Sequence, residues 1–128
     1  MAIVFLGLQP TATSILSKCL HQNGKETESI DTIEQFNTML SQRPDDVEAV
    51  IADDAELIAL KNLIMRNPML NMGLISPRST NEFHEATEGY GILMQLSSPP
   101  TKEDGMSFLA KLESLAALYP APKSGEMK

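Results

Sequence analysis

Short apolar runs alternate along the chain with longer stretches in which apolar residues recur at helical spacing. This alternation is typical of repeated strand-helix units built over a parallel sheet. Five such units can be counted. The first run, at residues 3–8, is apolar almost throughout, as expected for a central strand that helices cover on both faces. The other predicted strands are residues 27–30, 47–52, 72–75 and 92–96.

The helices between these strands are marked by capping residues and by proline and glycine. Pro10 is expected to start the first and Asn23-Gly24 to end it, and Asp31 with Glu34 has capping-box spacing for a helix running to about residue 43. The remaining helices are expected at about residues 55–66, 79–88 and 101–118. Apolar spacing predicts buried side chains at Leu57, Leu60, Ile64, Phe83 and Ala86. The last helix carries a series of apolar residues, namely Met106, Leu109, Leu112, Leu115 and Leu118.

Right-handed crossovers leave few topologies open for five such units. We therefore expect an α/β fold, a flavodoxin-like, three-layer, doubly wound sheet of five parallel strands in the order 2-1-3-4-5. The chain has 128 residues, about the length of one domain. Residues 1–118 are expected to form this domain. Residues 119–128 lack an apolar period and are expected to be a tail or the start of a linker.

Charge and cysteine content narrow the functional classes. The net charge of −7 argues against direct nucleic-acid binding, which depends on basic side chains. The opening segment MAIVFLGL is too short for a signal sequence or a membrane span, and the single Cys19 cannot form an intramolecular disulfide. We expect a cytoplasmic protein that does not interact with membranes.

Three polar residues follow predicted strands at their carboxyl ends, where doubly wound sheets place their sites. Asp53 and Asp54 come after the third strand, and Ser76 comes after the fourth. Either aspartate would also serve as an ordinary helix cap, and Ser76 before Pro77 would serve as a turn residue.

The chain resembles the receiver domain of two-component response regulators over residues 2–118. The resemblance lies in IVFLGL as strand one, EAVIAD as strand three, GLIS as strand four, and SSPP where the family has a lysine before a proline. It implies that Asp53 occupies the phosphoacceptor position of the phosphorelay. It also implies that Ser76 occupies the position of the hydroxyl that contacts the bound phosphoryl group.

The chain departs from the family at the other positions of the phosphorylation site. Gly7 and Leu8 stand where two acidic residues are expected, and Ser98 stands where the lysine is expected. Magnesium usually needs carboxylate ligands, and phosphoryl transfer needs its charge neutralised. The sequence therefore predicts a degenerate receiver, or pseudo-receiver, with no metal, no cofactor and an Asp53 that is not phosphorylated.

The leading hypothesis is a non-catalytic signalling module that binds protein partners or forms a homodimer, independently of phosphorylation. The receiver family commonly dimerises through its fourth helix, fifth strand and fifth helix, which gives as interface candidates Phe83, Tyr90, Met94, Met106 and Leu109. Met65 and Met69, at the end of the third helix, are a further candidate contact surface because methionine adapts to varied partners.

Two alternatives remain open at this point. One is a working receiver that is phosphorylated on Asp53. The other is a binder of a phosphate compound or nucleotide at residues 9–14, a hydroxyl-rich loop after strand one. His21 and His84 have no second ligand at metal spacing, and no catalytic triad can be assembled from them, so we expect no enzymatic activity. Arg78 with Ser79 and Thr80 could bind an anion at a helix start, although an ordinary capped start is the simpler interpretation.

Overall fold

The computed structural model describes residues 2–118, apart from the side chains of Glu56, Ala117 and Leu118. The expected tail at residues 119–128 lies outside the described residues. Five parallel strands form one sheet in the order β2-β1-β3-β4-β5, which confirms the predicted flavodoxin-like topology. The strands are β1 (Ala2–Leu6), β2 (Glu26–Ile30), β3 (Val47–Asp53), β4 (Met72–Ile75) and β5 (Met94–Leu96).

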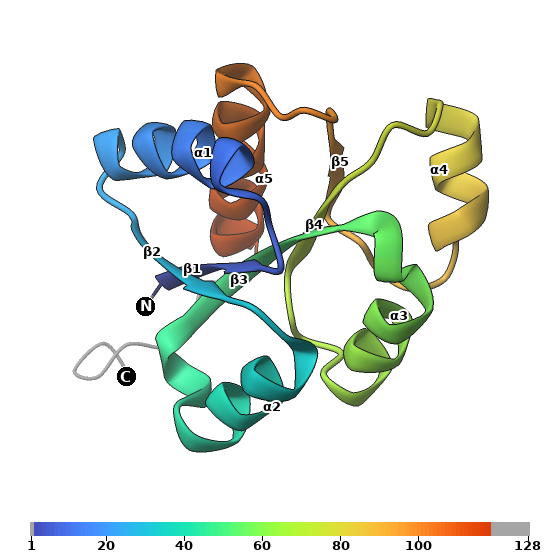
Figure 1. Cartoon of the computed structure of the whole chain (residues 1–128), viewed down its shortest axis with the longest axis horizontal. Coiled ribbons are helices and arrows are strands. Elements are labelled where there is room, and N and C mark those ends of the chain that lie inside the picture. The colour runs from blue at the N-terminus through green and yellow to red at the C-terminus, as the bar shows by residue number, and fades with distance from the viewer. Residues whose placement is uncertain (1, 119–128) are drawn as a thin grey trace.

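Helices cover both faces of this sheet, so the molecule has three layers (Figure 1). α1 (Pro10–Gln22) and α5 (Lys102–Leu118) lie on one face. α2 (Ile33–Gln42), α3 (Leu57–Arg66) and α4 (Thr80–Thr87) lie on the other. Two short 3-10 turns, η1 (Pro44–Asp46) and η2 (Asp54–Glu56), precede β3 and α3.

The core is divided by the sheet into two clusters, because successive side chains of a strand point to opposite faces. Ile3 and Phe5 of β1 pack under α1 and α5, whereas Val4 and Leu6 pack under α2 and α3. Burial on both faces explains why the first predicted strand is apolar at every position.

Several element boundaries differ from the sequence-based expectation by one or two residues. β1 ends at Leu6 and not at residue 8, because Gly7 adopts a φ of +65° and donates its N–H to the Ile30 carbonyl. The capping box of α2 is formed by Thr32 and Gln35, one residue later than the expected Asp31 and Glu34. β5 begins at Met94 and not at residue 92.

The apolar residues noted in the fifth helix mark its buried side only in part. Phe108 is fully buried, whereas Met106 is exposed and Leu115 is only half-buried. Gly105 and Phe108 were not among those apolar residues, and Gly105 allows α5 to approach α1 closely. A Cβ atom at Gly105 would lie 2.9 Å from Cys19 Sγ. Leu109 and Leu112 are buried, and the Leu118 side chain is outside the described part of the structure.

The fourth helix is short and is fixed by its first turn. Ser79 and Glu82 form the predicted capping box, and the hydrogen bonds from Ser79 hold the pKa of Glu82 below its ordinary value. A lowered carboxyl pKa stabilises the fold above the ordinary glutamate value, and this contribution is lost as the pH falls through the lowered pKa. Phe83 is buried as predicted, while Thr87 replaces Ala86 as the second buried position. Within residues 2–118, none of the helices has the length and apolar content needed to span a bilayer.

Gly73 in β4 provides a test of core packing. A Cβ atom there would lie 2.7 Å from Phe108 Cε1 and 2.9 Å from Leu96 Cδ1. We expect Gly73→Ala to lower the free energy of unfolding by about 1–3 kcal/mol, the usual cost of overpacking a core, measured by urea denaturation. Phe108→Leu, introduced as a second substitution, should make the double variant more stable than the sum of the single effects. Unchanged stability of Gly73→Ala would contradict this description of the core.

Candidate functional site

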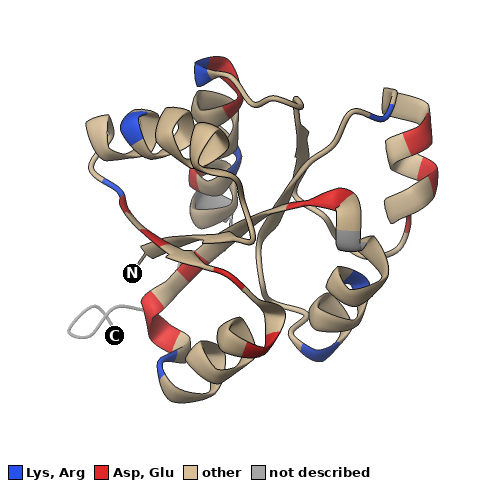
Figure 2. Ribbon diagram, viewed as in Figure 1, with Lys and Arg blue, Asp and Glu red and all other residues tan. Residues whose placement is uncertain are grey.

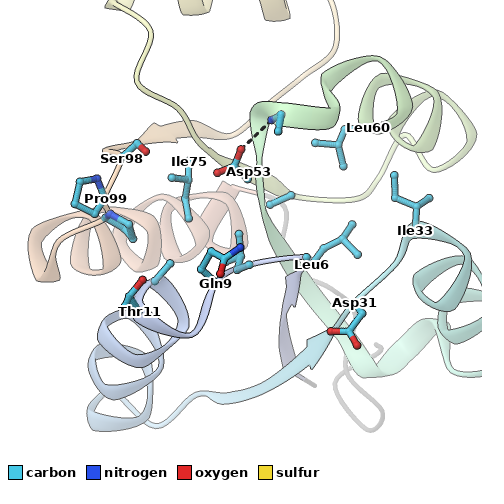
Figure 3. Close-up of a pocket in the computed structure, with 16 residues that line it drawn as sticks. Leu6, Gln9, Thr11, Asp31, Ile33, Asp53, Leu60, Ile75, Ser98 and Pro99 are labelled. Carbon is cyan, nitrogen blue, oxygen red and sulfur yellow. Dashed lines mark hydrogen bonds between the residues drawn. The ribbon is translucent and has the colours of Figure 1, made fainter.

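A pocket of about 440 Å³ opens at the carboxyl ends of β1 and β3, where the strand order reverses. Sites of doubly wound sheets are commonly found at this place. Figure 3 shows Asp53, Ser98 and Pro99 around the pocket, with Gln9 and Thr11 at the start of α1. The full lining is Leu6, Gly7, Leu8, Gln9, Thr11, Ala12, Asp31, Ile33, Ala52, Asp53, Ala55, Leu60, Ile75, Ser98, Pro99 and Pro100.

The pocket brings together the positions that the receiver resemblance aligns with a phosphorylation site. Asp53, Gly7, Leu8 and Ser98 all line it, although they come from three distant segments of the chain. The alignment with the receiver family that was chosen from the sequence therefore selects residues that lie around one hollow. Asp53 itself is exposed, and its Oδ1 accepts a hydrogen bond of 2.8 Å from the Ala55 N–H. This is the helix-capping contact that the sequence left open as the alternative role of Asp53.

The side chains in the pocket do not fit a magnesium ion, which takes oxygen ligands in near-octahedral geometry and is usually held by carboxylates. Gly7 and Leu8 contribute no carboxylate, and the other acid of the lining, Asp31, lies on the far side of Leu6 from Asp53 (Figure 3). Among the described side chains, no three His, Cys, Asp or Glu residues are grouped so that they could bind a metal. The described lining also contains no lysine or arginine.

Ser76 does not line this pocket. It is 2% exposed, and its hydroxyl donates a hydrogen bond of 2.5 Å to Asp54 Oδ2. The same carboxylate oxygen accepts a bond of 3.0 Å from Arg78 Nε, and the Arg78 N–H donates to Ser76 Oγ at 3.2 Å. Ser76, Asp54 and Arg78 thus form a closed triangle of hydrogen bonds, which we call the Asp54 cluster.

The Asp54 cluster is also anchored from the edge strand. Gln95 of β5 donates its side-chain amide to the carbonyl oxygens of Ser76, at 3.1 Å, and of Arg78, at 2.7 Å. The turn after β4 is therefore fixed by a carboxylate on one side and an amide on the other. A hydroxyl has one hydrogen to donate, and that of Ser76 is used by Asp54.

The sequence identified Ser76 and both aspartates but not the cluster that joins Ser76 to Asp54. Asp54 and Arg78 had separate expected roles, as a cap and as part of an anion site. The structure instead pairs the two side chains, and α4 begins with the ordinary Ser79 cap. The available signal was their position: both follow adjacent parallel strands at the same edge of the sheet, where side chains of opposite charge can meet.

The five residues expected at an interface do not form one surface. Phe83 and Leu109 are buried in the core clusters on opposite faces of the sheet, so these two predictions were wrong. Both were chosen from helical spacing, which does not separate an inward stripe from a contact surface. Tyr90 and Met94 are half-buried. Met106 is exposed but lies beside α1, where Asn23 Nδ2 approaches its sulfur at 3.5 Å.

The sequence matches no protein-family model and no curated protein. Solved structures, in contrast, match nearly the whole chain. A response regulator receiver protein from Pseudoalteromonas atlantica is 18% identical, with a TM-score of 0.71 over 91% of this chain and 99% of that one. A signal receiver domain from Pseudomonas fluorescens is 15% identical, with a TM-score of 0.73 over 91% of this chain and 97% of that one.

An atypical orphan response regulator is also similar, at 14% identity and a TM-score of 0.71 over 88% of this chain and 96% of the other. The chain has the receiver fold. At these identities the likeness establishes the fold, and the expected resemblance is confirmed at that level. The chemistry that this receiver fold can perform depends on the residues described above.

The Asp54 cluster should contribute measurably to stability. Ser76→Ala leaves Asp54 without its buried donor, and we expect a loss of about 1–3 kcal/mol in the free energy of unfolding. In a double-mutant cycle, Ser76→Ala and Asp54→Ala should show a coupling energy of about 0.5–3 kcal/mol. Asp53→Ala is the matched control, because Asp53 shares no hydrogen bond with Ser76. Equal coupling of Ser76 to both aspartates would argue against the cluster.

Proposed function

We propose that this chain is a receiver-like signalling module that acts through contacts with proteins, without phosphorylation and without catalytic activity of its own. The observation that supports the proposal best is the engagement of the Ser76 hydroxyl by Asp54. The receiver resemblance gives Ser76 the task of contacting a phosphoryl group on Asp53. In this chain the Ser76 hydroxyl already donates its hydrogen to the Asp54 carboxylate.

The Asp54 carboxylate is the electrostatic counterpart of a phosphoryl oxygen, because it accepts hydrogen bonds from the Ser76 hydroxyl and from the Arg78 guanidinium at the same time. Hydrogen bonds to charged acceptors are stronger than those between neutral groups. Moving Ser76 toward Asp53 would break the bond to Asp54 and leave that carboxylate with fewer donors. In this interpretation Asp54 keeps the turn after β4 in the conformation in which Ser76 is directed to Asp54 and away from Asp53.

The surroundings of Asp53 also support phosphorylation independence. A phosphoryl group on Asp53 would add negative charge to a pocket whose described lining already includes Asp31 and lacks a basic side chain. The whole chain has a net charge of −7. Phosphoryl transfer depends mainly on positioning and on neutralising the charge of the phosphoryl oxygens. The same repulsion disfavours the alternative of a phosphate compound in this pocket.

Among the proteins with the same fold, the atypical orphan regulator is described as having a phosphorylation-independent regulatory mechanism, and another similar structure is an orphan response regulator of H. pylori. These two proteins show that the receiver fold occurs in orphan regulators, one of which is described as working without phosphorylation. By analogy we place this chain in a cytoplasmic signalling pathway, with protein partners.

Incubation of the chain with acetyl phosphate and Mg²⁺ should leave its intact mass unchanged. The physical reason is that the described lining provides neither the carboxylates to hold Mg²⁺ beside Asp53 nor a basic side chain to neutralise a phosphoryl group there. A receiver domain that retains the acidic pair and the lysine, treated in parallel, is the positive control. A stable gain of one phosphoryl group, abolished by Asp53→Asn, would overturn the proposal and favour a working receiver.

The two acidic residues and the lysine that the receiver resemblance implies can also be introduced by substitution. The triple variant Gly7→Asp, Leu8→Asp, Ser98→Lys places two carboxylates and an ammonium group around Asp53. Aspartate is among the residues that best tolerate the positive φ of Gly7. We expect calorimetry to detect Mg²⁺ binding to this variant and none to the parent chain. Equal Mg²⁺ affinity of parent and variant would show that other side chains form a metal site.

A further inference from the structure

α3 has an outward-facing apolar stripe that the core does not use. Ile58 is 79% exposed, Met65 is 68% exposed, and Met69, just beyond the helix, is 90% exposed. Residues seven apart lie on the same side of a helix, and this side is opposite the buried Leu60 and Ile64. Exposed side chains of this size at helical spacing are typical of a contact surface.

A hollow of about 550 Å³ lies directly beside this stripe. Its lining comes from the end of α3 and from the loop between α4 and β5, and it consists of Ile64, Met65, Pro68, Glu88, Gly89, Tyr90 and Gly91. Lys61 of α3 lies over the Tyr90 ring, with Nζ 4.8 Å from the centroid, so the two sides of the hollow are connected. Protruding apolar side chains and an apolar hollow are therefore adjacent on one surface.

The same surface contains charges of both signs. The described charged residues of α3 are basic, whereas those of α4 are acidic, and Figure 2 shows them as blue and red segments of neighbouring helices. Lys61 borders the stripe on the side of the hollow, and Glu88 belongs to the lining of the hollow. Neither residue forms an ion pair among the described side chains.

We propose that a second copy of this chain docks on the surface formed by the α3 stripe and the adjoining hollow, giving an isologous dimer. In a two-fold contact, each patch must complement itself. This patch contains both halves of such a contact. Met65 and Met69 protrude beside an apolar hollow, and the patch has one basic side chain, Lys61, and one acidic side chain, Glu88. The inference rests on the proposed function, since it assigns a partner to a module that acts by protein contact.

This surface shares Tyr90 with the α4-β5-α5 surface that the sequence favoured, but it is centred on α3. Of the other candidates for the α4-β5-α5 surface, Phe83 and Leu109 are buried, and Met106 is the one that is among the large hydrophobic side chains exposed in the described structure. Three of the five large hydrophobic side chains exposed in the described structure instead belong to α3 or the residues directly after it. Net negative charge on both copies opposes association, so we expect a weak dimer that depends on concentration.

Sedimentation equilibrium over a range of concentrations measures this association directly. Ile58→Glu and Met69→Glu should each weaken the dimer by about tenfold or more, as expected for central apolar contacts. Ile15→Glu is the matched control, because Ile15 is 43% exposed on α1, across the sheet from α3. A chain that stays monomeric at all concentrations, or a dimer that is equally sensitive to Ile15→Glu, overturns the proposal.

Charge exchange tests the pairing across the two-fold axis. Lys61→Glu and Glu88→Lys should each weaken the dimer, and the variant with both exchanges should recover most of the parent affinity. If the single variants lose dimer affinity and the double variant does not recover it, while all variants keep the thermal stability of the parent chain, the proposal is also overturned. The proposed function is judged separately, by the mass measured after acetyl phosphate treatment. A dimer that forms only on the phosphorylated chain would contradict that function while supporting the surface.

Discussion

The burial of β1 and β3 on both faces is the constraint on which the rest of this structure depends. Their central side chains are almost completely buried between the sheet and the covering helices, as for Ile3, Phe5, Val50 and Ile51. The carboxyl ends of parallel strands covered in this way lie at one common edge, where polar side chains from different strands can meet. Asp53, Asp54 and Ser76 are together because β3 and β4 both end at that edge.

Two consecutive aspartates at the end of β3 have different environments. Asp53 is exposed, contacts the Ala55 N–H and lines the pocket, whereas Asp54 is directed to Ser76 and Arg78. Asp53 is the last, extended residue of β3, whereas Asp54 is the first residue of η2, and the two side chains have different hydrogen-bond partners. One position is open to chemical modification, and the other provides a fixed negative charge. In this chain the fixed charge is the one bonded to the hydroxyl that the resemblance assigns to signalling.

The elements predicted from the sequence were mostly right, because apolar period, capping residues and proline act locally. The errors occurred where contacts between distant segments decide the result. Phe108, Leu109 and Leu112 form the buried side of α5, and Gly105 lets that side approach Cys19 of α1; this close approach is a contact between segments far apart in the chain, which the spacing within α5 does not show. Asp54 and Arg78 pair across adjacent strands, so helix-capping rules applied to each segment alone could not find them.

The Asp54 cluster and the α3 surface are joined by the short turn η2. Asp53 fixes this turn through the Ala55 N–H, and Asp54 fixes it through Ser76 and Arg78. α3 begins directly after the turn, at Leu57. A reversible charge on Asp53 would act on the start of α3 through this turn, whereas a permanent bond from Asp54 to Ser76 keeps the start of the helix in place. In the proposed dimer the α3 surface would then be presented constantly, and its occupancy would be set by the concentration of the partner.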